Sequence, residues 1–183
     1  MKRGRVSQAN IIAKECIVSA LLQLIYEKPL TTITVSELTK RAGVSRMTFY
    51  RNYSSKEAIF SSHLEEVLEM YWKESEEQKQ TGTYYDRRHT LHCFEYLYKH
   101  RDFFEGLIYC GFGMLFLDVL TSYILKKWGE NNDKYILVAF SGSMYNLFNL
   151  WSSNKYKDSL EDMASKIEKI YGNGSGIPCA ESL

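Results

Sequence analysis

Apolar residues recur along almost the whole chain with helical spacing, and no segment alternates as a strand would, so the pattern predicts an all-α protein. The first stripe runs from Ile11 to Ile25 with apolar residues three or four positions apart, and Pro29 ends this helix near Lys28 because proline disfavours a helical residue before it. The first predicted element is therefore one long helix with a single buried face.

Two short helices are predicted next. Residues 34–37, Thr-Val-Ser-Glu, have the form of a capping box, so a helix should run from there to about Ala42, and Gly43 suits a left-handed break. Ser45 can then cap a second short helix that ends near Asn52. Helices of this length are marginal alone, so both need the first helix to complete a core. A three-helix unit with a glycine in a short turn is the helix-turn-helix arrangement.

The rest of the chain also has helical spacing. A second capping-box pattern, Ser-Ser-Lys-Glu at 54–57, should open a helix that reaches Glu77, and a polar loop follows. Further helices are expected at 85–100, 103–109, 114–128, 134–152 and 158–171. The sequence thus predicts a helix-turn-helix domain at 1–55, a larger helical domain at 56–172 and a flexible tail at 173–183.

Charge is distributed unevenly between these regions. Residues 1–56 contain ten Lys or Arg and three acidic residues, whereas residues 57–183 contain thirteen Lys or Arg and nineteen acidic residues, and the net charge of +1 hides this difference. A basic N-terminal part on an acidic body suits a protein of which one end binds a polyanion. The second short helix would present arginines and hydrogen-bonding side chains outward, which can read base edges in a major groove.

The stretch from Thr34 to Ile59 resembles the signature of the TetR/AcrR family of transcriptional regulators. The matching residues are Ala42-Gly43-Val44-Ser45, Thr48-Phe49-Tyr50-Arg51, Tyr53 and Ser55-Lys56-Glu57-Ala58. The resemblance covers roughly residues 8–60, and beyond them the chain matches the family mainly in length and helical character. It implies a regulator, a repressor by expectation, that binds a palindromic operator in double-stranded DNA as a homodimer.

The resemblance also implies which side chains contact the operator. They are Thr34, Ser45, Arg46, Met47, Thr48, Tyr50, Arg51 and Lys56. Arg46 and Met47 occupy base-reading positions, although Met47 can supply only apolar contact. Lys56 matches a phosphate-contacting lysine at a helix N-terminus, where an anion is favoured. Phe49 and Tyr53 are expected in the core.

In such a family member the larger domain holds a pocket for a small-molecule effector, here of unknown identity, and the dimer interface. The pocket residues are expected among Tyr96, Phe103, Phe112, Phe116 and Tyr145. Segment 135–151 is apolar or small nearly all round, so it should be buried on more than one side. With segment 158–171 it could form a two-fold bundle with a second copy of the chain.

Other classes of protein find less support in the sequence. The longest apolar segments, 112–125 and 135–151, are interrupted by polar residues, and no signal-peptide pattern follows the N-terminus, so we expect a cytoplasmic protein without membrane association. Cys16, Cys93 and Cys110 are interpreted as core thiols, and the histidines at 89, 92 and 100 as surface or capping residues, so neither a metal nor a cofactor is expected.

No nucleophile elbow or phosphate loop indicates a catalytic residue or an enzyme. Two alternatives stay open, namely a TetR-like co-regulator that acts mainly through a protein partner and an all-α protein that binds a small molecule.

Overall fold

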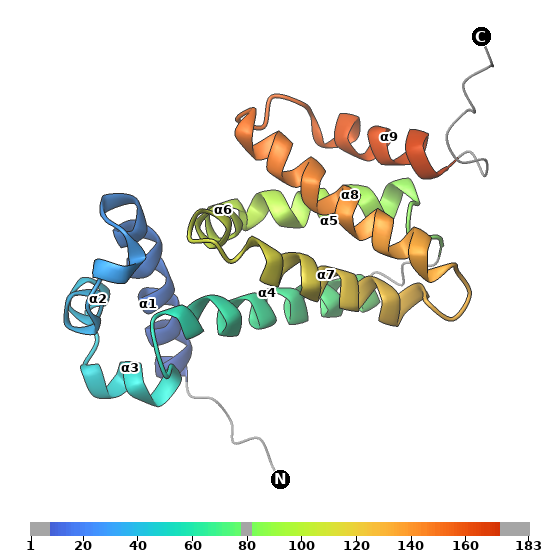
Figure 1. Cartoon of the computed structure of the whole chain (residues 1–183). Coiled ribbons are helices and arrows are strands. Elements are labelled where there is room, and N and C mark those ends of the chain that lie inside the picture. The colour runs from blue at the N-terminus through green and yellow to red at the C-terminus, as the bar shows by residue number, and fades with distance from the viewer. Residues whose placement is uncertain (1–7, 78–81, 173–183) are drawn as a thin grey trace. The chain divides into compact units, whose positions relative to one another are not determined.

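The computed structural model describes residues 8–77 and 82–172, and the tail predicted at 173–183 lies outside them. The described residues form nine α-helices and one short 3₁₀ helix, with no strand among them, which confirms the predicted all-α class (Figure 1). They divide into two compact units. The head unit comprises the chain up to Glu69 together with Gly106–Gly113, and the body unit comprises Met70–Glu105 and the chain from Met114 onward.

The head unit is built on a three-helix arrangement of α1 (Gln8–Glu27), α2 (Val35–Ala42) and α3 (Arg46–Asn52), followed by the first part of α4 (Glu57–Glu77). A short 3₁₀ helix, η1 (Leu30–Thr32), follows Pro29 and was not predicted from the sequence. The core of the head unit consists of side chains that are almost fully buried. They include Ile17, Leu21, Leu24, Leu38, Phe49 and Ile59.

The turn between α2 and α3 has the predicted geometry. Gly43 has φ +67°, and the N–H groups of Gly43 and Val44 donate to the carbonyls of Lys40 and Thr39. These two bonds form a Schellman motif, which needs a left-handed residue at the glycine position. Thr34 accepts a hydrogen bond from the Glu37 N–H at 3.2 Å. The α2 helix is therefore capped at both ends.

The first predicted capping box forms only in half. The Glu37 carboxylate is an ion-pair partner of Lys28, at the end of α1, and this ion pair lowers the pKa of the carboxyl. At the start of α4, Ser55 caps the helix by accepting from the Ala58 N–H at 3.2 Å. The Glu37 carboxylate thus pairs with Lys28 instead of accepting a hydrogen bond from the backbone at the start of α2, as the capping-box pattern predicted.

A glycine allows close approach of two segments in the head unit. Gly106, in the second half of α6 (Arg101–Tyr109), lies against α1, and a Cβ atom there would come within 2.6 Å of the Leu22 side chain and 2.9 Å of Ile25. Tyr109 at the end of α6 packs on Tyr26 of α1 with ring centroids 5.4 Å apart. This part of α6 therefore completes the outer layer of the head.

The body unit contains the remainder of α4 and α6 with α5 (Arg87–Lys99), α7 (Gly113–Trp128), α8 (Lys134–Ser153) and α9 (Leu160–Tyr171). Its centre is aromatic, because Phe104, Phe116 and Phe148 pack edge to face or tilted and are fully buried. Between α7 and α8, the hydroxyl of Thr121 lies 2.8 Å from that of the buried Ser141. Burial of Ser141 is thus compensated by hydrogen bonding.

The turn from α8 to α9 is unusual because two successive non-glycine residues, Lys155 and Tyr156, have φ of 57° and 55°. The Tyr156 hydroxyl donates to the Glu105 carboxylate, which also accepts from the Ser152 hydroxyl at 2.7 Å. These bonds hold a backbone conformation that side chains disfavour. Ser159 and Asp162 then form a complete capping box, so α9 begins two residues later than predicted.

Several predictions about exposure were wrong. Cys16 is exposed rather than in the core, and His89 and His92 are buried rather than at the surface, because each falls on the opposite side of its helix from the one assigned.

Among the described helices, α1 alone has the length and mean hydropathy, 1.4, of a membrane span, rather than the two segments considered from the sequence. Its buried side chains form the head core, and its Lys14 pairs with Glu66.

Candidate nucleic-acid interface and ligand cavity

The α3 helix has one buried and one exposed side. Phe49 is fully buried, whereas Met47 is 81% exposed and Tyr50 is 54% exposed. Arg46 and Arg51 are also exposed. The side of α3 turned away from the core therefore carries two guanidinium groups, a phenol and a thioether, a set that can contact both base edges and phosphates.

The start of α3 is fixed by its cap. The Ser45 hydroxyl accepts from the Thr48 N–H at 3.0 Å and lies 2.9 Å from the Thr48 hydroxyl. Both hydroxyls are therefore part of the cap, and each retains further hydrogen-bonding capacity. Thr34 is exposed at the start of α2, where its hydroxyl likewise caps the helix.

A pair of asparagines joins α1 to α3. The amide nitrogen of Asn10 donates to Asn52 Oδ1 at 3.0 Å, and the amide nitrogen of Asn52 donates back to Asn10 Oδ1 at 3.0 Å. Arg51 Nη2 donates to the same Asn10 oxygen at 3.3 Å. Neither asparagine was predicted from the sequence, because 42 positions separate them and neither belongs to a helical repeat. This pair orients Arg51 as well as the helix that carries it.

Lys56 is held by the protein itself. Its ammonium donates to the carbonyl oxygens of Ile33 at 2.8 Å and Thr31 at 3.1 Å. An ammonium has three donors, so one remains for another acceptor. The structure thus places Lys56 beneath the segment that leads to Thr34, in a role that the sequence analysis did not predict.

Part of the positive charge of the head unit is neutralised internally. Arg41 makes a two-pronged ion pair with Glu27, with N–O distances of 2.8 and 2.9 Å, and this arginine lowers the pKa of the glutamate carboxyl. Lys28 and Lys14 also pair with carboxylates. None of these three belongs to the eight predicted contact residues, so the internal pairs leave the exposed face of α3 cationic.

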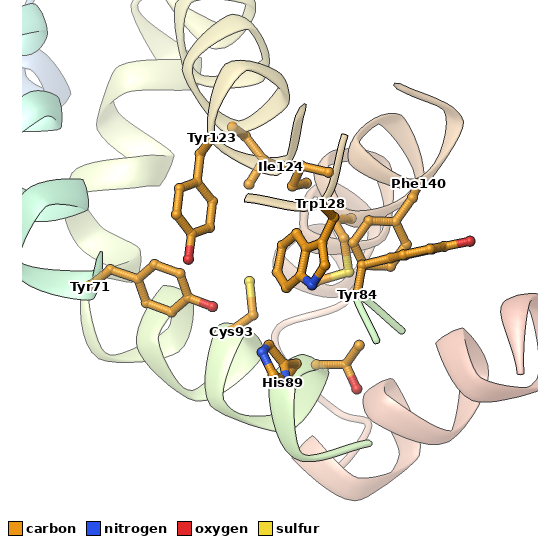
Figure 2. A pocket seen from close by; sticks show the side chains of 11 residues that line it. Tyr71, Tyr84, His89, Cys93, Tyr123, Ile124, Trp128 and Phe140 are labelled. Atoms are coloured by element: carbon orange, nitrogen blue, oxygen red, sulfur yellow. The ribbon is translucent and has the colours of Figure 1, made fainter. Parts of the chain in front are cut away.

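The body unit contains a small cavity lined mainly by aromatic and aliphatic side chains (Figure 2). Its lining residues come from α4, α5, α7, α8 and the segment before α5. They are Tyr71, Tyr84, His89, Thr90, Cys93, Leu120, Tyr123, Ile124, Trp128, Phe140 and Met144. Burial lowers the pKa of His89 to about 4 and raises the pKa of Cys93 to about 12, so the imidazole is neutral and the thiol is protonated at neutral pH.

None of the five residues predicted for an effector pocket lines this cavity. Phe103 and Phe116 are buried in the aromatic core, Tyr96 packs against Tyr71 and His100, and Tyr145 packs against Phe116. Phe112 belongs to the head unit, where it packs on Phe60 with ring centroids 5.1 Å apart. The sequence identified aromatic residues, but not which of them surround a cavity.

Residues 17–62 match the family of bacterial regulatory proteins of the tetR type. The head thus contains a helix-turn-helix domain of the TetR type. Over 52 residues the chain is 40% identical to the HTH-type transcriptional regulator EthR of Mycobacterium tuberculosis, and this match covers 28% of the chain and 24% of EthR. All eight predicted contact residues, from Thr34 to Lys56, fall within the TetR-type match.

Solved structures resemble the chain over most of its length. Lin0861 from Listeria innocua has a TM-score of 0.72 at 17% identity, covering 92% of this chain and 93% of that one. The transcriptional regulator FadR from Bacillus subtilis, in complex with stearoyl-CoA, has a TM-score of 0.61 at 17% identity, covering 88% of this chain and 98% of FadR. At these identities the likeness concerns the fold, so the TetR-type head is joined to a body of the same fold as in these proteins.

The part of the chain that the structure describes holds no cluster of three or more His, Cys, Asp or Glu side chains that could bind a metal ion. In the body unit, His92 Nε2 faces one carboxylate, Glu74, at 3.7 Å. His100 is the C-cap residue of α5.

Proposed function

We propose that this chain is a cytoplasmic transcriptional regulator, a repressor, that binds a palindromic operator as a homodimer and responds to a small-molecule effector. The observation that carries the proposal is the exposed cationic face of α3, where Arg46, Tyr50 and Arg51 are exposed while Phe49 is buried. A helix presented in this way fits a major groove. No catalytic residue or cofactor is part of the proposal.

The eight contact residues divide into two groups. Arg46 and Met47 are assigned to base edges, because both are exposed in the first turn of α3, and Tyr50 is assigned to the backbone or a neighbouring base edge. Hydroxyl and ammonium groups at helix starts, those of Thr34, Ser45, Thr48 and Lys56, together with Arg51, are assigned to phosphates or neighbouring base edges. Phosphate contacts of this kind position a protein on DNA, whereas base contacts give specificity.

The proposed dimer uses an uncovered stripe on α8. Tyr135 is 88% exposed and Leu150 is 57% exposed, and between them Ala139, Gly142 and Asn146 follow at helical spacing. A Cβ atom added at Gly142 would meet nothing within 4 Å. A stripe with bulky ends and a small middle lets a second copy of α8 approach closely across a two-fold axis. Two heads related in this way suit a palindromic operator.

Binding of the purified protein to DNA spanning its own promoter region, at two salt concentrations, tests this function. Tight binding that weakens with salt, and that is lost in the double variant Arg46→Ala/Tyr50→Ala, would support it. The matched control is Arg101→Ala/Tyr98→Ala, which removes the same two side-chain types from the body, where the Arg101 guanidinium lies 4.5 Å from the Tyr98 ring. Equal losses in both variants would count against a specific role of α3.

The alternative of a co-regulator acting through a protein partner gives a different result in the same experiment. It predicts no salt-sensitive DNA binding by the protein alone, and binding only after a partner is added. A protein that only binds a small molecule would bind no DNA under either condition. The exposed arginines of α3 favour the operator-binding function over both alternatives.

A further inference from the structure

His89 lines the body cavity, and neither of its two nitrogens has a hydrogen-bond partner in the described structure. Its side chain belongs to α5 and is only 3% exposed, and Nδ1 and Nε2 are both buried without a partner in the described structure. Its ring lies edge-on to Trp128 of α7, with centroids 5.4 Å apart (Figure 2). A buried imidazole with two unused nitrogens is costly unless another molecule completes its hydrogen bonds.

A second hollow, the outer groove, lies on the other side of Tyr123. It is lined by Trp72, Glu76, Tyr123, Lys126 and Lys127. The space in it that is open to the centre of a water molecule is about 200 Å³. Tyr123 lines both the groove and the cavity, and its ring is stacked on Trp72 at 5.2 Å. Tyr123 is thus the shared wall of the two spaces.

The outer groove combines aromatic surface with a net positive charge. The Lys127 ammonium lies 4.6 Å from the Trp128 ring and 5.6 Å from the Tyr123 ring, and burial lowers the pKa of this lysine. Lys126 adds a second ammonium, and Glu76 supplies one carboxylate. Trp72, which also lines the groove, has a buried Nε1–H without a partner in the described structure. These groups favour one negative charge on a ligand, and the single glutamate opposes a polyanion.

The inner cavity is small as it stands. The space open to the centre of a water molecule is about 20 Å³, room for about one water. A larger occupant has to displace side chains, and two of the lining residues suit this: Met144 is unbranched and adaptable, and Tyr123 is only partly buried. Movement of Tyr123 would join the cavity to the groove.

We propose that the joined space binds a small aromatic carboxylic acid that carries a ring hydroxyl. The hydroxyl pairs with one of the two nitrogens of His89, as donor to the acceptor nitrogen or as acceptor from the N–H of the neutral ring. The ring packs among Trp128, Tyr71 and Leu120, and the carboxylate meets Lys126 and Lys127. This inference rests on the proposed function only in that such a ligand would be the effector, and binding itself is measured without DNA.

Each polar group of this ligand class has a partner in the site: the hydroxyl contacts His89, and the carboxylate contacts the two lysines. A wholly apolar ligand would leave both nitrogens of His89 without a hydrogen bond, and burial of an unpaired polar group costs free energy. A ligand without a negative charge would make no use of the two lysines. The narrow, ring-lined cavity favours a flat molecule over a branched one.

Calorimetric titration of the full chain with 4-hydroxybenzoate, benzoate and phenol tests the inference. We expect the wild type to bind 4-hydroxybenzoate about tenfold more tightly than either analogue, since each analogue leaves one buried or charged group unpaired. His89→Phe should lose the advantage over benzoate and keep the advantage over phenol. Lys127→Gln should do the reverse. His100→Gln and Lys99→Gln change the same residue types outside both spaces and should behave as wild type.

Absence of saturable binding by the wild type, or equal affinity for all three compounds, would overturn the inference without any variant. If the variants bind like the wild type, the assigned contacts are wrong and the inference fails. Promoter binding measured on the same preparations separates the two proposals. DNA binding without ligand binding refutes only the ligand class, and ligand binding without DNA binding refutes only the operator function.

Discussion

Asn10 of α1 and Asn52 of α3 exchange two amide hydrogen bonds, each with an N–O distance of 3.0 Å, and the oxygen of Asn10 also accepts from Arg51. The first helix of the head is thereby tied to the last turn of the helix that is proposed to read DNA. An amide pair fixes the direction of both side chains, which an apolar contact does not. The angle of α3 on its supporting core therefore depends on a polar contact as well as on Phe49.

Removal of either asparagine should destabilise the head. We expect Asn10→Leu and Asn52→Leu each to lower the free energy of unfolding by about 1 kcal/mol, because each removes both hydrogen bonds that the two amides exchange. The double variant should cost less than the two single losses together, since both single variants remove the same pair of hydrogen bonds. Urea denaturation of the four proteins measures this cycle, and strictly additive losses would contradict it.

A side chain at position 106 should be poorly tolerated. Gly106→Ala places a Cβ atom against Leu22 and Ile25 of α1, and we expect a loss of about 1–3 kcal/mol despite the better helix propensity of alanine. Leu22→Ala in the same chain should recover part of the loss by making room. The control is Leu22→Ala alone, which gives the cost of that substitution in the absence of the added Cβ atom. Melting temperatures of the variants report the difference.

Charge in the middle of the α8 stripe should prevent dimerisation. Gly142→Arg places a long cation between Ala139 and Asn146, on the face assigned to the second copy, where two copies of the arginine would meet at the two-fold axis. We expect a monomer by analytical ultracentrifugation, and a promoter affinity at least about tenfold lower, because one head supplies only half of the phosphate contacts. A wild-type chain that is already monomeric would refute the dimer proposal.

The stability of the body should depend on pH through His89. Burial lowers the pKa of this histidine from 6.5 to about 4, so between those values the unfolded chain binds more protons than the folded one. Its contribution to stability is therefore complete above pH 6.5 and is lost as the pH falls towards 4. We expect His89→Phe to flatten the decline of unfolding free energy between pH 7 and pH 4.5.

The matched comparison for the pH dependence is His92→Gln. Burial also lowers the pKa of His92, but the neighbouring Glu74 carboxylate acts in the opposite direction, so this variant should change the slope less. Equal slopes in the wild type and His89→Phe would show that His89 does not carry the pH dependence. Because carboxylates titrate in the same range, the difference between proteins is the quantity to compare.

Local signals in the sequence identified the caps and the turn of the head. Thr34, Ser45 and Gly43 act through backbone groups one to three positions away, so caps and turn can be recognised from neighbouring residues, and all three have the expected geometry. Glu37 shows the limit of this reasoning. Its distance along the chain from Lys28 is only nine residues, yet the pairing depends on how α1 packs beside α2, which the local pattern does not encode.

The body was harder to predict because its side chains are chosen by long-range packing. Aromatic residues occur on α4 to α9, and helical spacing gives no means to decide which of them meet around a cavity, so His89 and Trp128 were not assigned to it. Small residues led to the prediction that α8 packs closely against another helix; in the single chain Ala139 is exposed and Gly142 is half-buried. The homodimer and the operator stay predictions until they are measured.

Lys56 has a consequence for how the protein would meet DNA. Most surface lysines lose side-chain conformational entropy when they bind a phosphate, and this loss weakens binding. Lys56 loses this entropy during folding, because the carbonyls of Thr31 and Ile33 already hold its ammonium in place. The head is in this respect preorganised, so the third hydrogen of that ammonium can meet a phosphate at little further entropic cost.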